Sequence, residues 1–199
     1  MTVKRHSSQP TRVEDDVLLD AARDCVLANG VRRTTLTDVA RRAGVSRMTL
    51  YRRFPDVRSL LAQLMTREFG SALTRTHAEV ADRPSARERL VTAAVAGVRV
   101  IANDPLMRTV LDRDGELVLP YVVERLGTTQ RIAEEFLVAQ LAAGHADGTV
   151  RAAVPAVQAR ALLLVVQSFV LSHVPATADV DADALLDELS HLLDSSLRP

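Results

Sequence analysis

The 199-residue sequence contains no tryptophan, only two tyrosines and four phenylalanines, and a single cysteine. One cysteine cannot form a disulfide within the chain, so a disulfide-stabilised secreted scaffold is excluded and a reducing compartment is expected. We interpret Cys25 as a small apolar filler of a helix; a redox-sensing thiol is the alternative.

Long hydrophobic runs and enzyme motifs are also missing. The most apolar stretch, residues 161–171, is far shorter than the ~20 residues of a membrane span, and we find no signal peptide, so a cytoplasmic protein is expected. The sequence has no glycine-rich phosphate loop, nucleophile elbow or Cys/His metal spacing. We therefore predict no catalytic residues, no cofactor and no metal ion.

What the chain does have is helix-forming apolar sequence. It is 47% hydrophobic, with many Ala, Leu and Val residues, and no alternating strand pattern is present. The composition favours an all-α fold. Apolar residues recur at three- and four-residue steps from residue 11 to 29, and Gly30 ends this first predicted helix.

The charges are balanced overall but unevenly distributed. Residues 1–60 hold 12 Lys and Arg against 7 Asp and Glu, and residues 61–199 hold 13 against 18. The first part therefore carries a net charge of +5 and the rest −5. A basic N-terminal part on an acidic body is typical of a DNA reader with a separate second domain.

Residues 35–54, TLTDVARRAGVSRMTLYRRF, predict two short helices joined by a tight turn. Thr37 supplies a side-chain oxygen that favours a helix start, and Gly44 can adopt the left-handed conformation that ends it. Ser46 can cap the second helix. The pattern predicts a helix-turn-helix that places its second helix in the major groove. A hairpin that only fills a core is the alternative, but it would not need five basic residues between 41 and 53.

The segments AGVSRMTLYRRF and PDVRSLL resemble the signature of the TetR (tetracycline-repressor-like) family of bacterial regulators. The specific match covers Gly30 to Met65; the rest agrees in length and helical pattern. The resemblance implies an N-terminal three-helix DNA-binding head, a C-terminal helical bundle that dimerises and binds an effector, and a location on the nucleoid when bound to DNA. On this basis we expect an N-terminal arm at 1–10, a DNA-binding domain at 11–55 and an effector-binding and dimerisation domain at 56–199.

The resemblance also assigns the DNA contacts. They fall on Thr37, Ser46, Arg47, Met48, Thr49, Tyr51, Arg52 and Arg58. We expect Arg47 and Arg52 to read guanine edges and Tyr51 to bind a phosphate. Arg41 and Arg42 are equally compatible with solvated and with DNA-bound positions. The two cations of the N-terminal arm favour a solvated tail, with a DNA contact as the alternative.

Two positions depart from the family pattern. Met48 stands where the family usually has glycine or another small residue, and it could offer an apolar contact to a thymine methyl group. Val57 stands where the family often has a phosphate-binding lysine, so the neighbouring Arg58 is the candidate for that contact.

The last helices predict a homodimer. The helix from Pro155 to about residue 172 and the leucine-rich helix after Asp181 carry more apolar surface than one chain can cover. The candidate interface residues are Leu164, Leu171, Leu185, Leu189 and Leu192. A two-fold dimer would match a pseudo-palindromic operator. The alternative is that both helices close a monomeric core.

Residues 86–144 hold the candidate effector site, in the region where family members place a ligand cavity. Polar groups within the apolar pattern suggest a lining of Val95, Arg99, Met107, Leu111, Tyr121, Phe136, Gln140 and Phe169. We expect a small hydrophobic effector, with Arg99 pairing an anionic group if one is present. Alternatively, Arg99 pairs with an acid of its own chain or reaches solvent.

These observations predict a ligand-responsive transcriptional regulator, acting as a repressor on family grounds. Two alternatives stay open. One is a helical DNA-binding protein without a small-molecule effector, and the other is an enzyme with an all-helical site that no motif reveals. Retardation of DNA, with or without relief by a small molecule, distinguishes the three.

Overall fold

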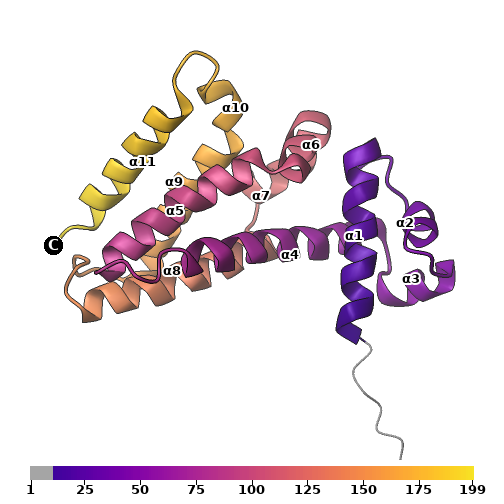
Figure 1. Ribbon diagram of the computed structural model, residues 1–199, viewed down its shortest axis with the longest axis horizontal. Coiled ribbons are helices and arrows are strands. Elements are labelled where there is room, and N and C mark those ends of the chain that lie inside the picture. The colour runs from indigo at the N-terminus through magenta and orange to yellow at the C-terminus, as the bar shows by residue number, and fades with distance from the viewer. Residues whose placement is uncertain (1–10) are drawn as a thin grey trace, which may run out of the picture. The chain divides into compact units, whose positions relative to one another are not determined.

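A computed structural model describes residues 11–199, and all of the regular secondary structure in that range is helical (Figure 1). The all-α prediction is confirmed. The predicted N-terminal arm at 1–10 lies outside the described residues. The chain divides into two compact units, one ending at Leu64 and the other running from Met65 to Pro199. Sequence predicts the boundary earlier, between residues 55 and 56.

The first unit is built from α1 (Thr11–Asn29), α2 (Leu36–Arg42), α3 (Arg47–Arg53) and the start of α4 (Val57–Ala78). Its core holds one or more side chains from each helix. The most deeply buried large ones are Val26, Val39, Leu50, Phe54, Leu60 and Leu64. Gly30 and Gly44 adopt φ angles of 81° and 69°. The left-handed conformation predicted for Gly44 is confirmed, and Gly30 ends α1 in the same conformation. This packing fixes α2 and α3 as a helix-turn-helix.

The start of α2 differs from the prediction. Thr35, not Thr37, caps the helix, because its hydroxyl accepts a hydrogen bond from the Asp38 N–H at 3.1 Å. The Thr35 hydroxyl in turn donates to the Asp38 carboxylate at 2.6 Å. The spacing Thr35-x-x-Asp38 is that of a capping box, a signal that the sequence contains. Thr37 lies half-buried in the first turn of the helix.

α4 is longer than expected. Sequence predicts irregular structure from Gly70 to Pro84, whereas the helix continues to Ala78. Burial of Ala72 and Thr76 outweighs the ~1 kcal/mol that glycine costs in a helix, and the Thr76 hydroxyl bonds the Ala72 carbonyl at 3.0 Å. Pro55 and Asp56 predict the start of this helix, with the acid in capping position. The structure confirms the cap, since the Asp56 carboxylate accepts from the Ser59 N–H at 2.7 Å.

In the second unit, α5 (Ala86–Asn103) packs against three other helices, α8 (Thr128–Ala146), α9 (Pro155–Leu171) and α11 (Ala182–Leu197). Figure 1 shows α5 running alongside α9 within this bundle. The remaining elements are α6 (Pro105–Asp114), the 3₁₀ helix η1 (Gly115–Leu117), α7 (Leu119–Val123) and α10 (His173–Ala176). Ser85 and Asp181 cap α5 and α11 as their positions in the sequence suggest.

The apolar pattern of residues 122–143 predicts one long amphipathic helix, whereas the structure has two helices there. α7 ends at Val123, and α8 begins at Thr128 after Gly127. Gln130 holds this break together. Its side chain accepts from the Gly127 N–H at 2.7 Å, donates to the Tyr121 carbonyl at 2.9 Å and contacts the Gln167 side chain.

The sequence predicts that the segment from Gly144 to Val150, with its two glycines, ends this helix; the helix does end there, but only after Gly144. Gly144 is buried within the helix, and Gly148, with φ 72°, follows the helix end. A Cβ atom at position 144 would lie 3.0 Å from the Cβ of Val150 and would clash with its methyl group. The carbonyl of Gly144 accepts from the N–H groups of Thr149 and Val150. The turn after α8 can therefore fold back onto the helix only because residue 144 has no side chain.

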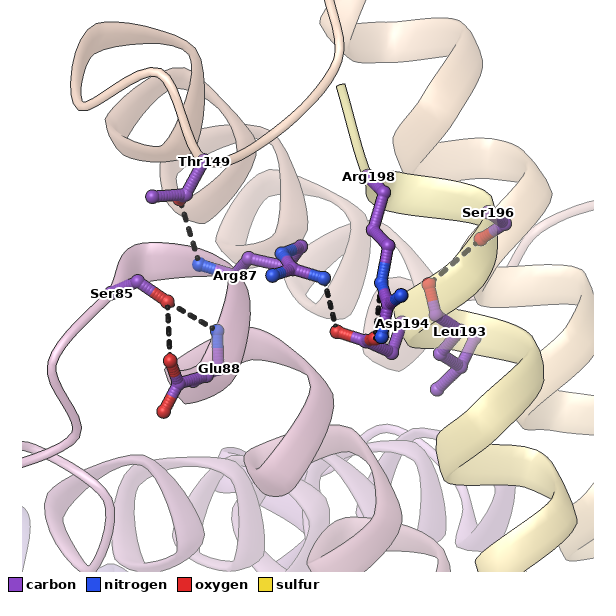
Figure 2. Close-up of polar contacts among 8 residues, drawn as sticks. All are labelled: Ser85, Arg87, Glu88, Thr149, Leu193, Asp194, Ser196 and Arg198. Atoms are coloured by element: carbon purple, nitrogen blue, oxygen red, sulfur yellow. Dashed lines mark hydrogen bonds and ion pairs between the residues drawn. The ribbon is translucent and has the colours of Figure 1, made fainter.

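Polar contacts tie α5 to the C-terminal end of the bundle (Figure 2). Arg87 pairs with Asp194 of α11 at 2.5 Å, and Asp194 also pairs with Arg198 at 2.6 Å. On the other side, the Arg87 N–H donates to the Thr149 hydroxyl at 3.3 Å. The chain just after Val150 is held as well, because the Arg151 N–H donates to the Leu197 carbonyl at 2.8 Å.

Candidate nucleic-acid interface

The site is organised by α3, whose inner face is fixed by the core. Leu50 is fully buried and Phe54 is 2% exposed. Ser46 caps the helix by accepting from the Thr49 N–H at 3.1 Å, as predicted. Residues two apart on a helix project about 200° apart. Met48 and Arg52 therefore lie on the face opposite Leu50.

The arginines around this helix separate into two groups. Arg41, Arg42 and Arg53 each form an ion pair within the first unit, with Asp38, Asp24 and Asp15 respectively. Arg47, Arg52 and Arg58 are exposed and form no ion pair with another residue of the described range. The second group can meet an anion without first breaking an ion pair.

The other predicted contact residues lie near this second group. Met48 is 77% exposed and Tyr51 is 49% exposed. Ser46 is exposed, whereas Thr49 is half-buried with its hydroxyl 2.8 Å from that of Ser46. These two hydroxyls therefore already contribute to the helix cap. The structure thus presents basic, aromatic and apolar side chains on one outer face, the arrangement that a groove-binding helix needs.

The candidate effector residues do not all come together. Val95, Met107, Leu111 and Phe169 belong to or pack against one apolar core in the second unit. The Phe136 ring instead meets the His77 ring edge-on at 5.0 Å, and Tyr121 lies beneath the Arg125 guanidinium at 5.5 Å. The Gln140 side chain is half-buried.

Arg99 does not point into that core. It is about half exposed, and its guanidinium pairs with Asp183 at the start of α11 at 2.5 Å. The structure therefore shows the alternative stated for Arg99, in which it pairs with an acid of its own chain. Sequence separates these partners by 84 residues, so no local pattern could have identified the pair.

A small void lies within the same bundle. It has a volume of about 10 Å³, about one water molecule's space. Its lining is wholly aliphatic: Leu90, Val91, Ala94, Leu137, Leu162, Val166, Leu193 and Leu197. None of the predicted effector residues lines it.

The candidate dimer residues differ in exposure. Leu164 and Leu192 are 53% and 55% exposed, while Leu171 and Leu185 are half-buried. Leu189 is fully buried in the core of its own chain. Its side chain therefore has no exposed surface that a second chain could contact. The exposed apolar face of α9 extends from Leu164 to Val157 and Val165.

The structure defines the environment of three titratable side chains, Cys25, His145 and His173. Burial raises the pKa of the Cys25 thiol, with the nearby Arg42 opposing the shift, which suits the predicted filler role. The His145 ring bonds the Gln158 side chain at 2.8 Å. His173 is buried at the junction of α9 and α10, and its Nδ1 atom has no hydrogen-bond partner.

Membrane-spanning potential in residues 11–199 is confined to one bent pair. No single helix there is long and apolar enough to cross a bilayer. Residues 86–103 and 105–117 reach the required length and hydropathy only together, and they are bent by 60° at the break.

Comparison with known proteins identifies a family for the region that holds the helix-turn-helix. Residues 18–64 match the family model of bacterial regulatory proteins of the tetR family. An HTH-type transcriptional regulator of Mycobacterium tuberculosis is 38% identical over 180 residues, which cover 90% of this chain and 92% of the relative.

Solved structures share the fold at lower identity. The repressor QsdR of Rhodococcus erythropolis, from the TetR family, has a TM-score of 0.69 at 18% identity and covers 96% of this chain and 98% of its own. FadR of Bacillus subtilis, solved in complex with stearoyl-CoA, has a TM-score of 0.64 at 18% identity and covers 92% and 99%.

Proposed function

Because the chain belongs to the tetR family of bacterial transcriptional regulators, we propose that it is a homodimeric repressor that binds a pseudo-palindromic operator and is released by a small apolar effector. Transcriptional regulation through a helix-turn-helix is the function of the family. The repressing direction, the dimer and the effector are the parts that we propose for this chain.

One observation carries the DNA-binding part of the proposal. Arg47, Arg52 and Arg58 are exposed without an ion pair in the described range, while Arg41, Arg42 and Arg53 near them are paired. Cations without an acidic neighbour gain most from a phosphate or a guanine edge, because no existing pair is lost. Tyr51 adds a hydroxyl group that can bond a phosphate of the DNA backbone.

The apolar face of α9 supports the proposed dimer. Val157, Leu164 and Val165 are 66%, 53% and 37% exposed, and their spacing places them on one side of the helix. Leu192 of α11 is exposed to a similar degree. A two-fold interface over these residues would present two copies of α3 to successive major grooves, ~34–36 Å apart or a multiple of that distance.

The effector part rests on the chemistry of the second unit. Its central void is wholly aliphatic, and four of the predicted lining residues lie in the surrounding core. Apolar walls select an apolar ligand, with a few polar groups for orientation. A solved relative that holds stearoyl-CoA supports an acyl chain as one such ligand.

The size of the void favours a second candidate, a repressor without an effector. Sites for small molecules measure ~300–1,000 Å³, whereas this void is about 10 Å³. An effector would have to open the bundle, which requires that it bind the opened state more tightly. A chain that never opens would regulate by DNA binding alone.

The experiment combines DNA retardation with a ligand screen. The purified protein is titrated against its own promoter region, and fatty acids, acyl thioesters and aromatic acids are screened by thermal shift. We expect retardation, and release of the DNA by a ligand that raises Tm. Retardation without any stabilising ligand would favour the second candidate, and the absence of retardation would contradict both.

Arg99→Ala tests the predicted anion contact. If a stabilising hit is anionic and displaces Asp183 from Arg99, its Tm shift should fall in this variant while operator binding persists. Asp183→Ala is the matched control, because it frees Arg99 without removing it and should preserve or increase the shift. Equal shifts in all three proteins would exclude Arg99 as the anion partner.

A further inference from the structure

Met48 is the most exposed of the exposed large apolar side chains in the described range, at 77%. It lies in the first turn of α3, directly after Arg47. Exposing an apolar side chain to water brings no favourable free energy. The sequence neighbours of Met48, Arg47 and Thr49, are basic and polar. The nearest buried side chain on its helix, Leu50, points to the other side.

The helix spacing places Met48 beside Arg52. Residues four apart share a helix face and lie ~6 Å apart along the axis. That face is opposite the core, so it is the one that faces a groove when α3 docks. N-terminal residues of a recognition helix are those that reach base edges.

The major groove offers one apolar group, the C5-methyl of thymine. We propose that Met48 reads a thymine methyl group in the operator, a short distance along the duplex from a guanine read by Arg52. This inference rests on the proposed operator binding and specifies its sequence content. Because ~6 Å spans about two base-pair steps of ~3.4 Å, the thymine lies within about two base pairs of the guanine in each half-site.

Charge supports this partner over a protein or a lipid tail. Arg47 directly precedes Met48 and Arg52 lies one turn further along α3. These two arginines, like Arg58 at the start of α4, have no ion pair in the described range. An apolar partner surface would leave these guanidinium groups buried and unpaired, which is costly. A groove with phosphate walls pairs the cations and presents a methyl group to the thioether side chain at the same time.

The test replaces thymine by deoxyuridine, which removes only the methyl group. Operators are selected from random duplex DNA with the full-length protein, and each thymine is then replaced in turn. We expect an affinity loss of about fourfold per half-site at one thymine, equivalent to the ~0.8 kcal/mol of one buried methyl group. Replacing the guanine within about two base pairs of that thymine by 7-deazaguanine, which lacks the N7 acceptor, should weaken DNA binding by the wild type but not by Arg52→Ala.

Variants at position 48 decide whether Met48 is the reader. In Met48→Ala the ratio of affinities for thymine and deoxyuridine duplexes should fall to about one, while Met48→Leu should keep most of it. Arg58→Ala is the control, because losing a phosphate contact weakens both duplexes equally and leaves the ratio unchanged. The exposure of Met48 makes misfolding of these variants a minor concern, which equal Tm values would verify.

The experiment distinguishes failure of the Met48 inference from failure of the proposed function. A specific operator without any uridine-sensitive thymine, or an undiminished ratio in Met48→Ala, would overturn the inference and leave the proposed function intact. Failure to select any preferred sequence would overturn both.

Discussion

At the scale of single residues, the strongest expectations concern Arg47 and Tyr51. Arg47→Ala should weaken operator binding by ~1–3 kcal/mol if the guanidinium makes a bidentate contact to guanine. Tyr51→Phe should cost ~0.5–1.5 kcal/mol, the value of one hydrogen bond. Both side chains are largely exposed, so Tm should stay nearly constant. Fluorescence anisotropy titrations at fixed salt measure the affinities.

Arg41 provides the matched control for these variants. It is already paired with Asp38 one turn away, so Arg41→Ala should bind the operator nearly as the wild type does. If Arg47→Ala and Tyr51→Phe also bound like the wild type, the assignment of α3 as the reading helix would be contradicted.

Local sequence predicts residues whose role depends on the backbone, and it fails where the role depends on distant partners. Gly44 and Ser46 were identifiable because a left-handed turn and a helix cap need those residue types. Arg99 was not, because its partner Asp183 is brought near it only by the bundle. Leu189 and Leu192 share one leucine-rich pattern, and only the packing of α11 decides that Leu189 is buried and Leu192 exposed.

At the scale of elements, the cap of α2 can be tested by comparing two threonines. Thr35→Ala removes the hydroxyl that bonds the Asp38 N–H and should lower the free energy of unfolding by ~0.5–2 kcal/mol. Thr37→Ala leaves the cap in place and should cost less. Urea denaturation of both variants measures the difference, and a larger cost for Thr37→Ala would refute the assignment.

The junction of α8 with α5 should respond to acid. Hydrogen bonds from the Thr149 hydroxyl and the Ala86 N–H lower the pKa of the Asp147 carboxyl group. A carboxyl whose folded pKa is depressed stabilises the fold above its unfolded pKa of ~3.9, and the contribution disappears as pH falls through the folded value.

Asp147→Asn should therefore show a smaller fall in stability between pH 5 and pH 3 than the wild type. Urea midpoints at several pH values provide the measurement. Because Asp147 is exposed, the effect should be modest, and identical pH profiles would show that these hydrogen bonds contribute nothing.

The helices themselves were predictable wherever apolar periodicity and caps agreed, as in α1, α5 and α11. Sequence failed at α4 and α8 because it treated Gly70 and Gly144 as helix ends. Glycine only weakens a helix by ~1 kcal/mol, and tertiary burial on both sides of it decides whether the helix continues. The break before α8 depends on the Gln130 side-chain contacts, which no local pattern reveals.

At the scale of the whole molecule, substitutions at two leucines distinguish an effect on dimerisation from an effect on folding. Leu164→Glu places a charge on the exposed face of α9 and should give a folded monomer of 21.7 kDa. Leu189→Glu buries an unpaired carboxylate and should unfold the second unit. Sedimentation and circular dichroism distinguish the two outcomes. A wild type that sediments as a 21.7 kDa species at micromolar concentration would refute the dimer.

Salt dependence tests the electrostatic part of operator binding. The logarithm of the association constant should fall linearly with log salt concentration, with a slope of about −0.9 per neutralised phosphate. Since a dimer carries two copies of Arg58, Arg58→Ala should reduce the magnitude of the slope by about 1.8. An unchanged slope would mean that Arg58 contacts no phosphate.

The close approach between Gly144 and Val150 has a consequence for the genes that such a repressor controls. Alanine at 144 would gain helix propensity but force the buried Val150 to move, and overpacking of ~1–3 kcal/mol exceeds that gain. The displacement would reach α11 through Arg151 and Leu197, within the second unit, whereas every predicted DNA contact belongs to the first. A Gly144→Ala strain should therefore repress in the cold and lose repression on warming, so that temperature would replace the chemical inducer.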